Sequence, residues 1–147
     1  MRLELGVLEM ACRVIQTNKR LAAERQIHAA ISHYRAGEFE CAITLSSAAE
    51  GQIPTPETPN HALGVMQQHS KSWTKKEKEI FNLTANWLKH DMPPLKVDIA
   101  IDELIVKFWL VRAISKYRAT YGFSTSEMIS VFPWAGQRPS RIPRRRI

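Results

Sequence analysis

The amino-acid sequence predicts an all-α protein, an up-and-down bundle of about four to five helices. Two observations predict this fold. All eight prolines fall into three clusters, within residues 54–59, 93–94 and 133–143, and leave long proline-free blocks between them. In these blocks apolar residues recur every three to four positions, the spacing that places them on one face of a helix. With 147 residues, 44% of them apolar, the chain is long enough for a single domain with a core of useful size.

The first block contains two predicted helices joined by a tight turn. Apolar residues at helical spacing, such as Ala23, Ile27 and Ile31, predict an amphipathic helix over roughly residues 17–36. Gly37 follows in the position that glycine favours just after a helix. The next helix, from residue 38 to 51, carries a narrow stripe of small residues. Because small side chains allow close approach, we expect a tightly packed antiparallel hairpin.

A loop and one or two further helices are predicted next. Three prolines make residues 51–59 (GQIPTPETP) a loop, and residues 61–69 show a weak helical pattern. Thr74 followed by Glu77 has the spacing of a capping box, in which each side chain caps the backbone of the other. This pair predicts the start of a helix that continues to Asp91.

The proline-free block over residues 95–132 allows two interpretations at its start. Val97, Ile99 and Ile101 alternate with other residues as in a strand, but the segment continues without a turn signal for about 24 residues, too long for one strand. We therefore predict a helix. From residue 104 to 114 it is apolar on nearly every side, which indicates a central helix in the core or across a subunit interface.

The end of the chain is predicted to hold one short helix and a tail. Ser124 and Glu127 form a second possible capping box, which predicts a helix to about Val131. We assign residues 1–132 to a single helical-bundle domain. We assign residues 133–147 to a tail that is expected to be disordered, because it is rich in proline and arginine and poor in apolar residues.

The positive charge of the chain is concentrated in this tail. The net charge is +7, yet residues 1–137 hold 16 basic and 14 acidic side chains. The other five basic residues belong to the tail: Arg138, Arg141, Arg144, Arg145 and Arg146. Two interpretations stay open. The tail keeps the protein soluble, or it makes a salt-sensitive contact with an anionic surface such as RNA, DNA or an acidic partner.

The sequence favours a cytoplasmic protein without a membrane partner. The longest nearly uncharged apolar run, residues 104–111, is interrupted by Lys107 and is far shorter than the roughly 20 residues that span a bilayer. Glu4 and Glu9 interrupt the first apolar residues, so the start does not match a secretory signal. Two cysteines do not make a disulfide framework.

One segment resembles known families. Residues 34–50 (YRAGEFECAITLSSAAE) combine Gly-Glu-aromatic, two further residues and alanine with an alanine-rich helix. Tetratricopeptide repeats use a similar pattern, but they need a 34-residue period, and residues 71–76 (KSWTKK) do not repeat residues 37–42. The chain resembles the HEPN domain, the nucleotide-binding domain of higher eukaryotes and prokaryotes.

The resemblance implies a prokaryotic-type helical bundle that is often a homodimer. The family includes RNA-cleaving toxins and inactive binding relatives. The ribonuclease members carry arginine, four to six residues and then histidine in a late helix, whereas here Arg112 is followed at that spacing by Tyr117. The resemblance therefore implies a non-catalytic binding or regulatory module, with nucleotide, RNA or a partner protein as ligand.

Two alternative functions remain. The first is a metal-independent ribonuclease of the toxin type that uses Arg112 and Tyr117 across a dimer cleft. These residues lie about 140° apart around an ideal helix, so they would have to converge from two chains or after a distortion of the helix. The second is a helical protein-interaction adaptor unrelated to HEPN.

Arg112 is the most informative candidate site residue. On a helix it shares a stripe with Ile101, Ile105 and Phe108, so its charge faces apolar neighbours and must find a partner. A structural ion pair with Glu50, which flanks an apolar stripe of its own helix, is one interpretation. Exposure of the guanidinium at the surface is another. The functional interpretation is an anion or RNA contact in a dimer cleft.

The sequence predicts neither a metal nor a cofactor. Asp98, Asp102 and Glu103 have a spacing that could hold a divalent cation, but acidic residues at the start of a helix are explained by its positive end. The five histidines lack the spacing of a zinc site, and no phosphate-binding glycine loop or hydrolase motif is present.

Overall fold

The fold is that of an α-helical bundle. The computed structural model describes residues 12–57, 74–89 and 99–137 of the 147-residue chain. These residues form five α-helices and one 3-10 helix and contain no strand, which confirms the predicted all-α class. In chain order the elements are α1 (Lys19–Arg35), α2 (Phe39–Gln52), α4 (Lys75–Lys89), α5 (Glu103–Tyr121), α6 (Ser126–Val131) and the 3-10 helix η2 (Pro133–Gly136).

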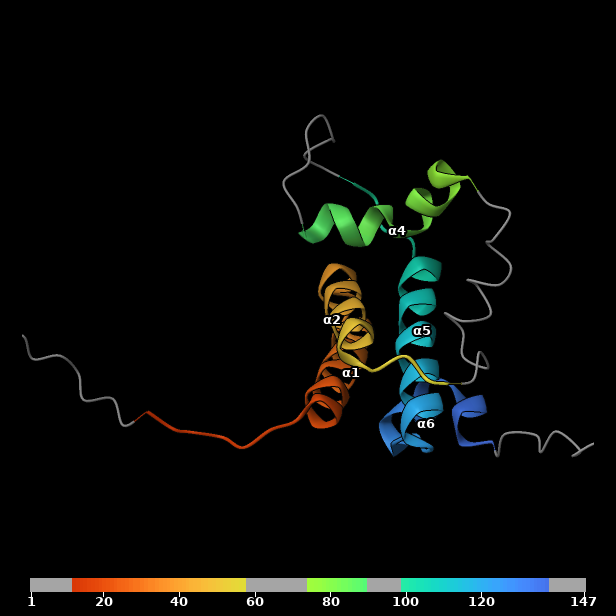
Figure 1. Ribbon diagram of the computed structural model, residues 1–147. Helices are drawn as coiled ribbons and strands as arrows, with labels where there is room; N and C mark the ends of the chain where they lie inside the picture. Colours follow the sequence, from red (N-terminus) through yellow and green to blue (C-terminus); the bar gives the residue numbers. More distant parts are fainter. Residues whose placement is uncertain (1–11, 58–73, 90–98, 138–147) are drawn as a thin grey trace, which may run out of the picture.

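Helices α1 and α2 form the predicted antiparallel hairpin (Figure 1). Asn18 caps α1 and accepts a hydrogen bond from the Leu21 amide at 2.9 Å. At the other end Gly37 adopts φ +77°, the left-handed region that glycine tolerates, and its amide donates to the Tyr34 carbonyl at 3.1 Å. In the predicted stripe of small residues Ala42 and Ala49 are fully buried, whereas Cys41 and Ala48 are half-buried.

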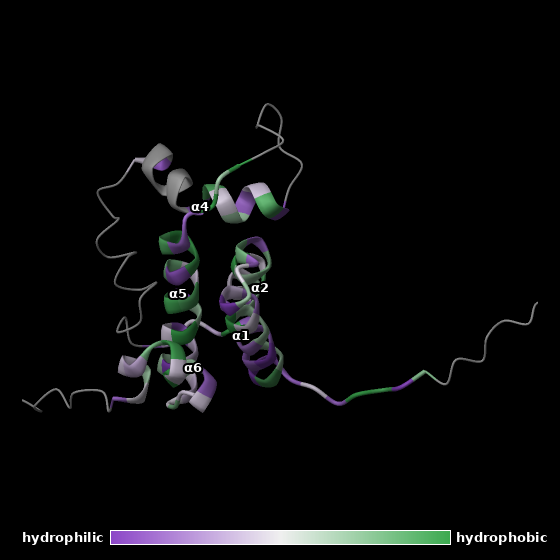
Figure 2. Ribbon diagram, turned by 180° about the vertical axis from the view of Figure 1, so that it is seen from behind, coloured by the Kyte–Doolittle hydropathy of each residue, from purple (hydrophilic) through white to green (hydrophobic). Residues whose placement is uncertain are grey.

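Helix α5 is the central element and lies beside the hairpin (Figure 1). It is antiparallel to α1, because Arg20 at the start of α1 bonds to Tyr117 near the end of α5, and Tyr34 near the end of α1 bonds to Glu103 at the start of α5. Figure 2 shows hydrophobic residues along much of α5. Its buried apolar residues confirm the predicted central helix: Val106, Trp109, Leu110, Ala113, Ile114 and Tyr117.

Helix α4 crosses one end of the bundle, beyond α2 and the start of α5 (Figures 1 and 2). It begins at Lys75, directly after Thr74, as the predicted capping box requires. Ala85 is buried and Leu88 packs against the core, so one face of the helix closes that end of the bundle. The weak helix predicted for residues 61–69 lies outside the described residues.

The start of α5 corrects one prediction. The helix begins at Glu103 rather than near residue 98, and residues 99–102 have no helical structure. Asp102 is the N-cap, and its carboxylate accepts from the Leu104 amide at 2.7 Å. This cap fixes the first turn, so the strand-like alternation of Ile99 and Ile101 belongs to an extended approach to the helix. Residues 95–98 lie outside the described part.

The start of α6 corrects a second prediction. Thr125 is the N-cap instead of Ser124, and its hydroxyl accepts from the Met128 amide at 3.4 Å. The capping interaction joins residues three apart, and Thr125 and Met128 satisfy that spacing as well as Ser124 and Glu127 do. Met128 is fully buried, which places the helix one residue later than predicted.

The first residues of the predicted tail pack against the bundle. Within η2 Ala135 is only 3% exposed, and Arg118 of α5 donates to the carbonyls of Trp134, at 3.2 Å, and Gln137. The ordered packing therefore continues to residue 137, five residues past the boundary predicted at residue 132. The tail arginines lie outside the described residues. Over the part of the chain that is described, no helix has the length and apolar character needed to cross a bilayer.

Candidate functional site

Arg112 and Glu50 form a buried bidentate ion pair between α5 and α2. The Arg112 Nε lies 2.7 Å from Glu50 Oε2, and its Nη2 lies 2.6 Å from Glu50 Oε1. The two side chains are 8% and 9% exposed. Two parallel charge-assisted bonds match the planar guanidinium to the carboxylate, the strongest geometry for such a pair. This result confirms the structural ion pair that the sequence suggests.

The face of the Arg112 guanidinium is also covered. Its Cζ atom lies 4.3 Å from the centre of the Trp109 ring and 5.5 Å from that of Phe108. A guanidinium over an indole face gains a cation–π attraction that increases as water is excluded. With one edge on a carboxylate and one face on a ring, Arg112 is held in place and its charge is neutralised.

Lys116, one turn further along α5, belongs to the same cluster. It is 6% exposed, and its ammonium donates to the Glu50 carbonyl oxygen at 2.9 Å. That carbonyl belongs to the last turn of α2, where backbone acceptors lack helical partners and the helix dipole favours a cation. Burial lowers the pKa of Lys116; Glu50 opposes this shift and Arg112 adds to it. We call Glu50, Trp109, Arg112 and Lys116 the buried cluster.

Tyr117 lies in a different environment from Arg112. It is fully buried, and its hydroxyl accepts a hydrogen bond from Arg20 Nη1 of α1 at 3.2 Å. Burial is the main cause of its raised pKa, partly offset by the hydrogen bond from Arg20. Arg112 therefore contacts α2 while Tyr117 contacts α1. Within one chain the structure does not bring the two candidate ribonuclease residues together.

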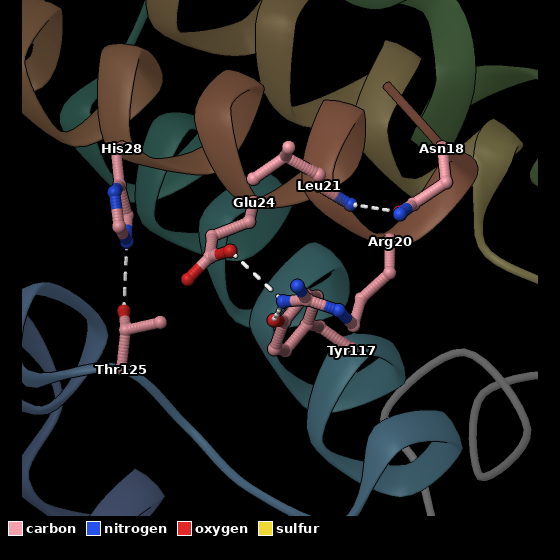
Figure 3. Close-up of polar contacts among 7 residues, drawn as sticks. All are labelled: Asn18, Arg20, Leu21, Glu24, His28, Tyr117 and Thr125. Carbon is pink, nitrogen blue, oxygen red and sulfur yellow. Dashed lines mark hydrogen bonds and ion pairs between the residues drawn. The ribbon is translucent and has the colours of Figure 1, made fainter. Parts of the chain in front are cut away.

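A second polar cluster surrounds the Tyr117 hydroxyl at the edge of the bundle (Figure 3). Arg20 Nη1 also pairs with Glu24 Oε2 at 3.0 Å, and the Arg20 guanidinium lies 5.9 Å from the centre of the Phe123 ring. The Arg20 side chain is 39% exposed and Phe123 is 45% exposed. We call Arg20, Glu24, Tyr117 and Phe123 the rim cluster.

Sequence reasoning missed the rim cluster. Arg20 and Phe123 are about a hundred positions apart, and only the antiparallel packing of α1 and α5 brings them together. One signal was present in the sequence. Gly122 follows the end of α5 and adopts φ +82°, so the chain turns sharply there and presents the next residue, Phe123, at the surface.

A hydrogen bond beside the rim cluster attaches α6 to α1 (Figure 3). His28 Nε2 lies 2.8 Å from the Thr125 hydroxyl, which is also the N-cap acceptor of α6. One threonine therefore starts α6 and fixes its first turn against α1. Further along the same two helices, Arg35 donates to the Ser130 hydroxyl at 2.8 Å.

Several basic residues belong to the end of the bundle where α1 begins and α5 ends, or to the chain segments that join it. Arg13 and Lys19 are exposed just before and at the start of α1. Arg118 holds the backbone from which the tail continues, so the five tail arginines follow directly from this end. Two acidic residues, Glu24 and Glu127, lie on the adjacent helices, and Glu24 is already paired with Arg20. We call Arg13, Lys19, Arg118 and the five tail arginines the basic end.

The remaining candidates do not form a site. Among the described residues no group of three or more histidine, cysteine or acidic side chains could hold a metal ion. Asp102 is used as a helix cap, and Asp98 lies outside the described residues. An open pocket of about 270 Å³ has a largely apolar lining and contains one thiol, that of Cys41. Its lining residues are His33, Glu40, Cys41, Thr44, Leu45 and Leu88. His33 Nδ1 lies 3.2 Å from Oε1 of Glu38, the residue at the N-cap of α2.

No family model, curated protein or solved structure matches the chain. The resemblance to the HEPN domain therefore rests on residues 34–50, and the function is argued from the two clusters and the basic end.

Proposed function

We propose that the chain is a non-catalytic, HEPN-like binding module that works as a homodimer and binds RNA at its basic end. The observation that carries the non-catalytic part is the bidentate pair between Arg112 and Glu50. A catalytic arginine has to reach the charge that develops on a phosphate during cleavage. Arg112 instead directs Nε and Nη2 at a carboxylate inside the bundle.

The position of Tyr117 supports the same conclusion. A general acid or base must come within hydrogen-bond reach of the group whose proton it transfers. The Tyr117 hydroxyl is buried and held by Arg20, so RNA at the surface does not reach it. Both residues that would perform toxin-type cleavage thus have structural partners in the folded chain.

The distribution of charge supports RNA as the ligand. Lysine and arginine side chains bind the phosphate backbone and release its counterions, which supplies most of the affinity of non-specific complexes. The basic end carries exposed Arg13 and Lys19, and the tail adds five arginines and no acid. Residues 1–137 carry a net charge of +2, so the tail supplies five of the seven net positive charges of the chain.

Fluorescence anisotropy with a labelled single-stranded RNA tests the proposed ligand. We expect the full-length chain to bind and a chain ending at Gln137 to bind more weakly. If all five tail arginines contact phosphates, the slope of log affinity against log salt should become shallower by up to about 3.5 in the shortened chain. Lys89→Glu, on α4 at the opposite end of the bundle, is the matched control and should leave the slope unchanged. Absence of binding would leave the protein-interaction adaptor as the better account.

A cleavage assay on the same RNA tests the non-catalytic part. We expect the RNA to stay intact during long incubation with the full-length protein. Because Arg112→Ala would leave Glu50 unpaired, the informative variant is Glu50→Leu with Arg112→Leu, which removes both charges together. Cleavage by the unmodified protein that disappears in this folded double variant would favour the ribonuclease.

The homodimer comes from the resemblance alone, and light scattering tests it. A mass of about twice that of the respective chain, which is 16.8 kDa at full length, for both the full-length chain and the chain ending at Gln137 would support a dimer formed by the bundle. A monomer would remove the dimer from the proposal and leave the RNA contact intact.

A further inference from the structure

Phe123 is the only aromatic residue among the large hydrophobic side chains that are exposed in the described part of the chain. The other exposed large hydrophobic residues of the described part are all aliphatic: Val14, Ile15, Leu83, Ile99 and Leu104. An aromatic ring in water is unfavourable by the free energy of its apolar surface. A single exposed ring is ordinary, so its surroundings decide whether it has a role.

The Phe123 ring packs against a buried aromatic residue. Its centre lies 5.5 Å from that of the Tyr117 ring at an angle of 81°, an edge-to-face contact. Tyr117 is fully buried and packs against Tyr121 with ring centres 4.9 Å apart, so it is a rigid support. Gly122, in the left-handed region, sets the backbone from which the ring projects. A ligand that stacks on this ring therefore loses little free energy in ordering it.

Arg20 places a positive charge over one face of the Phe123 ring. Its guanidinium carbon lies 5.9 Å from the centre of the Phe123 ring. Within the described residues, its hydrogen bonds to Glu24 and Tyr117 both use Nη1, which leaves Nε and Nη2 for a ligand. With the guanidinium over one face, the other face of the ring offers a stacking surface for a base, and the remaining donors of Arg20 can bind a phosphate.

We propose that Phe123 is the stacking platform for an unpaired base of RNA, and that Arg20 binds the adjoining phosphate. This inference rests on the proposed function and specifies the contact at the basic end. It also selects the form of the RNA, because only a base outside a duplex exposes its face to a side chain. Duplex RNA should therefore bind only through the charges of the basic end.

The test uses full-length protein and a single-stranded RNA that carries the fluorescent base 2-aminopurine. Stacking of that base on an aromatic ring changes its fluorescence, so the signal reports the contact itself. Phe123→Ala should weaken binding about tenfold, since stacking on one aromatic side chain contributes that much to single-strand affinity. The salt dependence should stay the same, because no charge is removed.

Three further variants separate stacking from other effects. Phe123→Trp should keep or strengthen binding, whereas Phe123→Leu, which keeps the apolar volume without an aromatic face, should bind as weakly as Phe123→Ala. Leu104→Ala removes an exposed apolar side chain at the other end of α5 and should change nothing. Circular dichroism checks that each variant is folded.

The outcomes distinguish the two proposals. If the protein binds RNA with the expected salt dependence and Phe123→Ala binds as well as the unmodified chain, the stacking platform is wrong and the proposed function stands. Equal binding by Phe123→Leu and the unmodified chain would also overturn it, in favour of simple apolar contact. If the unmodified chain does not bind RNA at all, both proposals are wrong.

Discussion

Two arginines of the bundle have the same kinds of neighbours and opposite surroundings. Arg112 and Arg20 each pair with a glutamate and each lie over an aromatic ring. Arg112 makes two bonds to Glu50 and is 8% exposed, whereas Arg20 makes one bond to Glu24 and is 39% exposed. The neighbours alone therefore do not identify a binding residue. What distinguishes the two arginines is the exposed fraction of the side chain, which decides whether a ligand can reach the guanidinium.

The same comparison explains why burial decides the role of each arginine–glutamate pair. A buried charge without a partner is very unfavourable, so Arg112 and Glu50 each depend on the other to remain charged inside the bundle. The pair of Arg20 and Glu24 is only part-buried, so water screens it and it contributes less to stability. The buried cluster is therefore expected to serve folding, whereas the rim cluster is the one that we propose for RNA recognition.

The largest expected effect is that of Glu50→Ala. It leaves Arg112 buried and unpaired and takes away two charge-assisted hydrogen bonds. We expect the free energy of unfolding to fall by about 3–5 kcal/mol, measured by urea denaturation followed by circular dichroism. Glu24→Ala is the matched control at the rim and should cost less than about 1 kcal/mol. Equal losses in the two variants would remove the distinction between the clusters.

A smaller effect is expected where α6 joins α1. Thr125→Ala removes both the N-cap of α6 and the hydrogen bond to His28. We expect a loss of about 1–2 kcal/mol, measured by thermal denaturation. Ser124→Ala is the adjacent control, since the buried Ser124 hydroxyl has no hydrogen-bond partner among the described residues. A loss in Ser124→Ala as large as that in Thr125→Ala would contradict the assignment of the cap.

Arg20→Ala should lower RNA affinity as well as stability, whereas Glu50→Ala should affect mainly stability. It removes a part-exposed pair and leaves the buried Tyr117 hydroxyl without its donor, which costs about 1–2 kcal/mol, so we expect a loss of stability below that of Glu50→Ala. Its effect on RNA affinity should be several-fold, and the salt slope should become shallower by about 0.7, because the variant binds one phosphate fewer. Denaturation and anisotropy on the same preparation measure both. A large loss of stability with unchanged RNA binding would show that Arg20 stabilises the fold and does not bind RNA.

The elements that were predictable from the sequence are those fixed by local signals. Gly37 and the apolar spacing of α1 set the turn and the hairpin, and Thr74 marks the start of α4. The pair of Arg112 with Glu50 was accessible as well, because a charge on an apolar stripe must find a partner and few carboxylates lie on such stripes.

What the sequence did not reveal depends on contacts between distant residues or on competition between adjacent ones. Arg20 and Phe123 meet only because α1 and α5 are antiparallel. Thr125 and Ser124 are both good caps, and the burial of Met128 decides between them. The packing of residues 133–137 depends on two backbone carbonyls that Arg118 reaches, and backbone acceptors carry no signature in the sequence.

The smallest expected effect is at the other end of the α1–α5 contact and compares two tyrosines. The Tyr34 hydroxyl donates to Glu103 Oε1 at 2.7 Å, and burial together with this bond raises the pKa of Tyr34 from 10.0 to about 12. At the rim the pKa of Tyr117 is also raised by burial, but there the hydrogen bond from Arg20 acts in the opposite direction.

Because the folded pKa of Tyr34 lies above the unfolded value, the unfolded chain releases this proton first as pH rises. The contribution of Tyr34 to stability is therefore fully present below pH 10 and is lost as the pH approaches 12. Difference absorbance of tyrosinate between the unmodified chain and Tyr34→Phe measures the pKa. Glu103→Gln should lower it, since the amide removes the negative charge beside the hydroxyl. An unchanged pKa in Glu103→Gln would mean that burial alone raises it, and that the bond at this end of α5 contributes as little as an exposed pair does.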